Sequence, residues 1–146
     1  PYLIEYNIRM GDPECQVLMM RLETDLVKII DCAIKNKINK LKIKWNKKKS
    51  ITIVLCALGY PNKYIRNSEI KNLTNILTNK DAQIFHAGTY KNKNRIYSSG
   101  GRVLNITTLS KSFLYARNKS LKILKKINWV DGFFRKDIGW RVINNK

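Results

Sequence analysis

The first fourteen residues constrain the fold of this chain more than any other stretch. Residues 2–9 are mostly β-branched, aromatic or aliphatic, and a glycine and a proline follow soon after. This is the composition of a strand that stops at a turn. Because successive side chains of a strand point to opposite faces, one face is apolar and the other carries Glu5, Asn7 and Arg9.

This polar row predicts a binding site for a divalent cation and a phosphate. Carboxylate and amide oxygens bind hard cations, and the fork of Arg9 suits phosphoryl oxygens. Asp12 and Glu14 add further oxygen atoms directly after the row. An edge strand with mixed charges on its solvated face explains the same spacing equally well, and Asp12 has a structural alternative as the cap of the following helix.

Hydrophobic periodicity predicts an α+β fold. Two amphipathic helices are expected, at residues 14–34 and at residues 110–128, the second with Leu114 and Leu124 facing inward. Strands are expected, in chain order, at residues 51–57, 83–89, 94–98, 102–108 and 137–143. The 94–98 strand should pair with 83–89 across a turn at 91–93. Residues 63–80, which include Leu77, fit a helix and a loop equally well.

The net charge of +19 is unevenly distributed. Residues 1–35 hold four Lys and Arg against six Asp and Glu, a net −2, so the rest of the chain carries +21. A nucleic-acid-binding module is one explanation, and it requires the cations to gather on one face. The Lys residues occur together with many Asn and Ile, which share A/T-rich codons, so mutational bias explains the surplus better and nucleic acid is not the expected partner.

The cysteines and the single histidine argue against a zinc site. Cys15, Cys32 and Cys56 are widely spaced, and His86 stands alone. Such cysteines fit a reducing, cytoplasmic compartment. No apolar run reaches the length needed to span a bilayer, so no membrane partner is expected. The chain starts at Pro1 within an apparent strand, and we expect it to be the C-terminal part of a longer polypeptide.

Five short blocks of sequence resemble one enzyme family. Glu5-x-Asn7-x-Arg9 followed by Gly11-Asp12-Pro13-Glu14 is similar to the last metal-binding strand of the ATP-grasp ligases. Four more blocks follow in the order and spacing of the phosphoribosylamine–glycine ligase family of purine biosynthesis: Gly59-Tyr60-Pro61, His86-Ala87-Gly88-Thr89, Gly100-Gly101-Arg102-Val103-Leu104 and Arg135-Lys136-Asp137-Ile138-Gly139. The resemblance extends over essentially the whole chain.

The resemblance implies a two-step reaction. ATP would phosphorylate the glycine carboxylate, and the amine of 5-phosphoribosylamine would attack the acyl phosphate to give glycinamide ribonucleotide, ADP and phosphate. By match to the motif, Glu5 and Asn7 would bind Mg²⁺ or Mn²⁺ and Arg9 would steady the transferred phosphoryl group. Asp12 would orient Arg9 or approach the amine substrate.

The resemblance also implies a domain division. Residues 1–35 would end an ATP-grasp domain, and residues 36–146 would form a small β-rich half-barrel with one main helix. The amine-substrate domain, the ATP lid and most of the ATP-grasp core are absent from these residues, so the chain alone is expected to be inactive and to need those parts as a partner. A non-catalytic remnant is the remaining alternative.

Three further predictions concern the substrate. Gly100, Gly101 and Arg102 would bring backbone N–H groups and a guanidinium to the ribose phosphate, or else form a simple bend that needs positive φ. Arg135 and Lys136 would contact the substrate phosphate or form an ion pair at the start of the last strand. His86 is expected to be a core or hydrogen-bonded residue rather than a general base.

Overall fold

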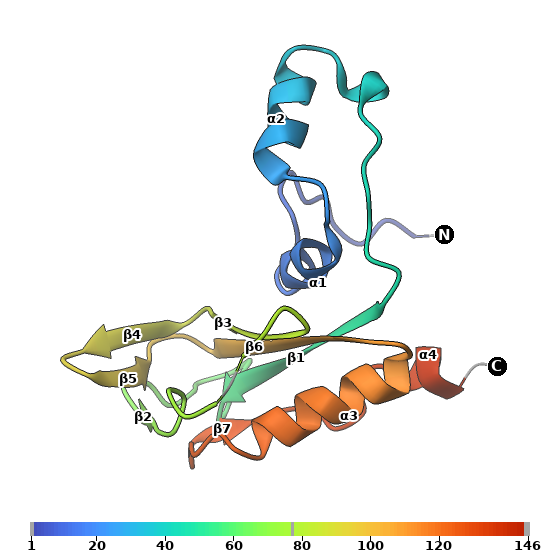
Figure 1. Cartoon of the computed structure of the whole chain (residues 1–146). Coiled ribbons are helices and arrows are strands. Elements are labelled where there is room, and N and C mark those ends of the chain that lie inside the picture. The colour runs from blue at the N-terminus through green and yellow to red at the C-terminus, as the bar shows by residue number, and fades with distance from the viewer. Residues whose placement is uncertain (1, 77, 145–146) are drawn as a thin grey trace.

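A four-stranded antiparallel sheet with helices on both faces forms the centre of the molecule (Figure 1). It is seen in a computed structural model that describes residues 2–76 and 78–144. The strand order is β3 (Ala82–His86), β6 (Arg102–Ser110), β1 (Lys49–Ala57) and β7 (Gly132–Phe133). Helix α3 (Phe113–Leu124) lies on one face, and α1 (Glu14–Arg21) lies against β1 and β6 on the other. The α+β prediction is therefore confirmed.

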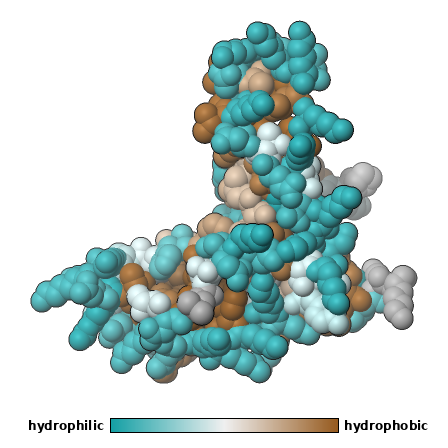
Figure 2. Space-filling model, in the orientation of Figure 1, coloured by the Kyte–Doolittle hydropathy of each residue, from teal (hydrophilic) through white to brown (hydrophobic). Residues whose placement is uncertain are grey.

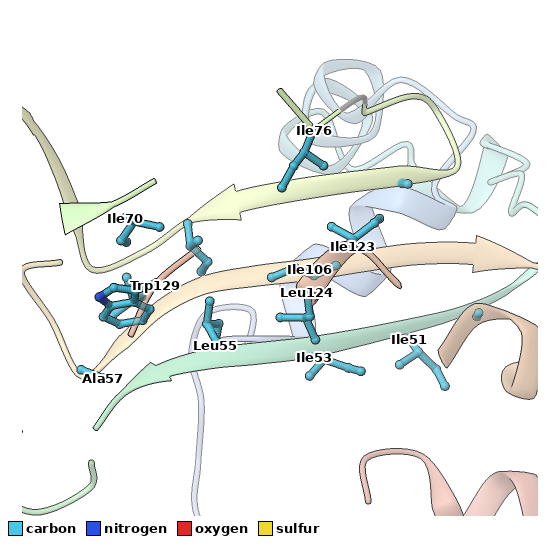
Figure 3. Close-up of a cluster of buried hydrophobic side chains, with 14 residues drawn as sticks. Ile51, Ile53, Leu55, Ala57, Ile70, Ile76, Ile106, Ile123, Leu124 and Trp129 are labelled. Carbon is cyan, nitrogen blue, oxygen red and sulfur yellow. The ribbon is translucent and has the colours of Figure 1, made fainter. Parts of the chain in front are cut away.

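The main core fills the space between the sheet and α3 (Figure 3). Ile53 pairs with Ile106 across β1 and β6, and both side chains are fully buried. Ile123 and Leu124 of α3 pack onto this layer. Each such residue contributes about 1.5–3 kcal/mol of burial free energy, so this layer fixes the register of the long strands.

The opposite face of the same strands is also covered. Residues 103–109 of β6 are buried without alternation because α3 covers one face and α1 the other. On the α1 side, the Thr107 hydroxyl lies 2.8 Å from the Thr52 hydroxyl. The 51–57 and 102–108 strand predictions are both confirmed. Residues 51–57 are a nearly continuous apolar run, whereas residues 102–108 also place polar side chains such as Asn105 and Thr107 on the covered face.

A smaller sheet has the strand order β2 (Glu69–Ile70), β5 (Arg95–Ser98) and β4 (Thr89–Asn92). The predicted 83–89 strand is divided, because β3 ends at His86 and β4 begins at Thr89. Strand β5 therefore pairs with β4, not with β3. A two-residue turn joins them, with Lys93 at φ 53°.

The predicted helix at residues 14–34 is two helices. Helix α1 ends at Arg21, and α2 (Leu26–Ile34) starts after Asp25, whose carboxylate accepts a hydrogen bond from the Lys28 N–H at 3.0 Å. Between them, the Glu23 N–H donates to the Lys44 carbonyl at 3.0 Å. The local cap and the pairing with the returning connector together break the helix.

Helix α2 and the following η1 (Ile38–Lys40) stand away from the sheet (Figure 1). Their apolar side chains are exposed, and Val27 and Ile34 are 73% and 76% accessible. Figure 2 shows hydrophobic residues on the surface of the part of the molecule that contains α2. No helix in residues 2–76 or 78–144 is long and apolar enough to cross a bilayer.

Three other predicted elements differ from the structure. Helix α3 begins at Phe113, because Ser112 and not Ser110 caps it, and Leu114 is exposed. The predicted final strand at 137–143 is instead a turn followed by helix α4 (Trp140–Asn144), since Gly139 adopts φ 80°. Residues 63–76 form β2 and irregular structure rather than a helix, and Leu77 lies outside the described residues.

Candidate functional site

The opening segment, residues 2–10, forms no helix or strand. No described strand pairs with residues 2–10, and their apolar side chains are exposed, with Ile4 at 92% and Ile8 at 103%. The strand prediction is therefore wrong for this chain in isolation. The apolar composition is present, but no described sheet edge lies beside it to satisfy the backbone.

Glu5 and Asn7 nevertheless lie together. The Asn7 side-chain N–H donates to Glu5 Oε1 at 2.7 Å, and both residues are exposed. This pair leaves the Asn7 carbonyl oxygen and the second Glu5 oxygen for a hard cation. Within residues 2–76 and 78–144, no three His, Cys, Asp or Glu side chains form a metal cluster. The pair thus fits part of an oxygen-ligand set for Mg²⁺, which prefers six ligands.

Arg9 points back along its own segment. Its guanidinium donates to the Met10 carbonyl at 3.0 Å and has an exposed environment. It makes no contact with Asp12 in the hydrogen bonds and ion pairs of the described residues. An orienting role of Asp12 toward Arg9 thus stays a prediction.

Asp12 instead contacts Arg102, ninety residues away. The Arg102 guanidinium donates to the Asp12 carbonyl at 2.7 Å and lies 3.2 Å from its carboxylate. Gln16 donates to the same carboxylate at 3.1 Å. Asp12 therefore does not cap α1. The N-cap position is Pro13, and no side chain caps the helix. The Glu14 carboxylate accepts a hydrogen bond from the Gly11 N–H, which lies before the helix, at 3.1 Å.

The Asp12–Arg102 contact borders a cavity of about 350 Å³ on the α1 side of the sheet. We name it the Arg102 cavity. Its cationic members are Arg102 and Arg135, two residues that the sequence suggested for substrate binding. Its remaining wall is mostly apolar and aromatic, with Val54, Tyr60, Pro61, Phe133 and Phe134. Two guanidinium groups above an apolar wall suit an organic phosphate.

Arg135 is held by its neighbour Asp137. Two guanidinium N–H groups donate to the Asp137 carboxylate at 2.6 and 3.0 Å. The bonded Arg135 keeps the pKa of Asp137 below its ordinary value. The predicted ion pair is thus present, although at a turn and not at the start of a strand. Lys136 lines a different cavity, so the structure does not bring it together with Arg135.

The Gly100–Gly101 pair is required by close packing and not by backbone conformation. A Cβ atom on Gly101 would lie 2.2 Å from the Tyr60 ring, and one on Gly100 would lie 3.1 Å from the Gly88 Cα. The glycines with positive φ in the described part of the chain are Gly59 and Gly139. The alternative of a bend needing positive φ is therefore wrong at Gly100 and Gly101.

His86 is exposed, and its Nδ1 lies 3.0 Å from the Thr89 hydroxyl. The hydrogen-bonded alternative is confirmed, and the core alternative is wrong. Sequence reasoning missed Cys56, which lines the Arg102 cavity. Burial raises the pKa of its thiol, against a smaller lowering effect of Arg102. Cys15, Cys32 and Cys56 are all free thiols.

Comparison with known proteins gives a consistent result. The family model described as "Phosphoribosylglycinamide synthetase, C domain" matches residues 50–141. A phosphoribosylamine–glycine ligase of Brucella melitensis is 41% identical over 146 residues, covering 100% of this chain and 34% of that protein. A chloroplastic phosphoribosylamine–glycine ligase of Arabidopsis thaliana is 43% identical over 148 residues, covering 100% of this chain and 28% of that protein.

The solved structures include a phosphoribosylamine–glycine ligase of Thermotoga maritima that superposes with a TM-score of 0.67 at 26% identity. The match covers 94% of this chain and 33% of that chain. This chain therefore spans about a third of the length of the relatives it matches, and the match falls on their C-terminal part.

Proposed function

This chain belongs to the phosphoribosylglycinamide synthetase C-domain family, and we propose that it acts as the C-terminal part of a phosphoribosylamine–glycine ligase. That enzyme would use ATP to join glycine to 5-phosphoribosylamine, giving glycinamide ribonucleotide, ADP and phosphate. One observation carries the proposal: the match to the ligase of Brucella melitensis runs over all 146 residues, so it includes both the Glu5–Arg9 segment and the Arg102 cavity.

We propose that residues 1–35 complete an ATP-grasp domain and that residues 36–146 form the C-terminal domain. The exposed apolar side chains of residues 2–8 and of α2 support this division, since contiguous apolar surface of this kind calls for a partner. The partner would be the amine-substrate and ATP-grasp parts of the same enzyme.

In the assembled site, Glu5 and Asn7 would supply two oxygen ligands to Mg²⁺ or Mn²⁺. A metal ion bound there neutralises charge on the ATP phosphates. Arg9, released from the Met10 carbonyl, would donate to the transferred phosphoryl group. The mutual hydrogen bond of Glu5 and Asn7 orients both side chains toward one side, which supports their joint role.

The Arg102 cavity would hold the phosphoribosyl group. Arg102 and Arg135 would donate to the ribose phosphate, and the aromatic wall would exclude water. Asp12 follows the metal-binding segment in the sequence and is bound to Arg102 of this cavity. Asp12 is therefore suited to meet the amine of the phosphoribosylamine. The three free thiols support a reducing, cytoplasmic location.

A chimeric enzyme tests this proposal. This chain would replace the matching C-terminal third of the Brucella melitensis ligase, and ATP-dependent formation of glycinamide ribonucleotide would be measured. Loss of a metal ligand removes several kcal/mol of transition-state stabilisation. Glu5→Gln and Asn7→Ala should therefore each lower the rate at least about a hundredfold.

The control is Asn94→Ala, an exposed change in the β4–β5 turn that should leave the rate unaltered. Unchanged thermal melting of all three variants would exclude unfolding as the cause. A chimera that turns over normally with both Glu5→Gln and Asn7→Ala would refute the assignment of these ligands.

A further inference from the structure

A second cavity, of about 480 Å³, lies along α3. We name it the α3 cavity. It shares only Phe134 with the Arg102 cavity, so it is a separate site among the described residues. Its wall is cationic, with Arg117, Lys122, Lys125 and Lys136.

The positive charge of the α3 cavity is not compensated. No carboxylate lines it, and none of its four cations takes part in an ion pair in residues 2–76 and 78–144. Arg117 acts electrostatically on Asp137, but the carboxylate of Asp137 is already bound by Arg135 through two hydrogen bonds. Like charges that converge without a counterion repel one another, and a bound anion relieves that repulsion.

Arg117 is the fixed member of this group. One of its terminal nitrogens donates to the Lys136 carbonyl, which anchors the guanidinium between α3 and the 134–136 loop. Its Nε is buried and has no hydrogen-bond partner among the described residues. A buried donor without a partner is uncommon in a folded protein.

The rest of the wall combines a polar and an apolar part. Asn118 offers a side-chain amide beside the cations, whereas Leu121 and Phe134 provide an apolar surface. A lysine ammonium binds phosphate as a point charge, and an arginine binds it with a planar fork. Four such groups around one cavity match a ligand with several negative charges better than a single carboxylate.

We propose that the α3 cavity binds a multivalent phosphate anion. The guanidinium of Arg117 and the ammonium groups of Lys122, Lys125 and Lys136 would donate to the phosphate oxygens. Two sources share this chemistry, a nucleoside polyphosphate and an inorganic polyphosphate. In the first, the base or sugar would lie against Leu121 and Phe134. The site is independent of the ligase reaction proposed above.

Isothermal titration calorimetry on the full 146-residue chain tests the proposal. ATP and inorganic tripolyphosphate would be titrated separately, without divalent metal and at about 0.15 M salt. We expect saturable binding to one site. The double variant Lys122→Gln/Lys125→Gln removes two exposed charges and should weaken binding about tenfold or more, because hydrogen bonds to charged groups are involved.

The matched control is Lys91→Gln/Lys93→Gln, which removes the same charge from the β4–β5 hairpin and should change the affinity less than about twofold. Arg117→Gln is a second test of the cavity, with circular dichroism to show that the variant is folded. ATP binding more tightly than tripolyphosphate would assign the nucleotide, and equal affinities would assign the phosphate chain alone.

Several results would overturn the proposal. The first is an equal loss of affinity for tripolyphosphate in the cavity and hairpin double variants. The second is the absence of saturable binding, and the third is binding of a single-stranded RNA of about twelve nucleotides but of neither phosphate ligand. Arg102→Gln should leave tripolyphosphate affinity unaltered, because Arg102 lines the other cavity. A loss in that variant would place the anion in the Arg102 cavity and not in the α3 cavity.

Discussion

At the residue scale, Gly101 shows how a small residue shapes the Arg102 cavity. Its Cα faces the ring of Tyr60, and an added Cβ would lie 2.2 Å from that ring. Gly101→Ala should therefore force Tyr60 to move and lower the free energy of unfolding by about 1–3 kcal/mol. Urea denaturation measures this loss. In the Tyr60→Ala background the same substitution should cost much less, and equal costs in both backgrounds would show that the ring is not the obstacle.

Asp12 and Arg102 show what residue-level reasoning can and cannot reach. Motif resemblance predicted both as site residues, but it gave Asp12 other partners, namely Arg9 or the amine substrate. The observed contact spans ninety residues, and no local pattern encodes a contact at that separation. Cys56 also could not be predicted as a cavity residue, because its place in the wall depends on the contact between β1 and the distant 133–138 segment.

At the scale of elements, an ion pair between Lys48 and Asp81 joins the residue before β1 to the residue before β3. The Lys48 hydrogen bond keeps the pKa of Asp81 below its ordinary value, against the opposing effect of partial burial. A lowered folded-state pKa stabilises the protein above the ordinary carboxyl value of about 3.9, and this contribution disappears as pH falls through the lowered pKa.

Lys48→Gln should thus reduce the free energy of unfolding by up to about 1 kcal/mol near neutral pH, since the pair is partly exposed. The difference from the wild type should shrink between about pH 5 and pH 2. Urea denaturation at several pH values measures it. Lys63→Gln, which removes a lysine outside the ion pairs of the described residues, is the control. A difference in unfolding free energy between wild type and Lys48→Gln that stays constant down to pH 2 would show that ionised Asp81 does not stabilise the fold.

Elements with strong internal signals were predictable. Strand β1 is a nearly continuous apolar run, β6 is rich in β-branched and aliphatic residues, and α3 has helical periodicity, so their existence follows from the sequence alone. Elements whose form depends on contacts with distant parts of the chain could not be predicted from the sequence. The break between α1 and α2 requires the Glu23–Lys44 pairing, and α4 replaces a predicted strand because Gly139 turns the chain.

At the scale of the whole molecule, the chain has two contrasting parts. The sheet and α3 enclose a sealed core, whereas the opening segment and α2 expose their apolar side chains. Residues 2–8 have the composition of a strand but no described neighbour to pair with. The strand predicted there does not form in this chain, because no described strand lies beside it to pair with its backbone. Such a molecule is expected to work as one part of a larger assembly.

We propose that this chain acts as the C-terminal part of a phosphoribosylamine–glycine ligase, so the N-terminal two thirds of a relative should complete it. The most direct test measures glycine-dependent ADP release by this chain, by the N-terminal two thirds of the Brucella melitensis ligase, and by their mixture. We expect neither part to be active alone and the mixture to release ADP and form glycinamide ribonucleotide. Turnover by this chain alone, or a mixture in which the parts associate but remain inactive, would contradict the claim.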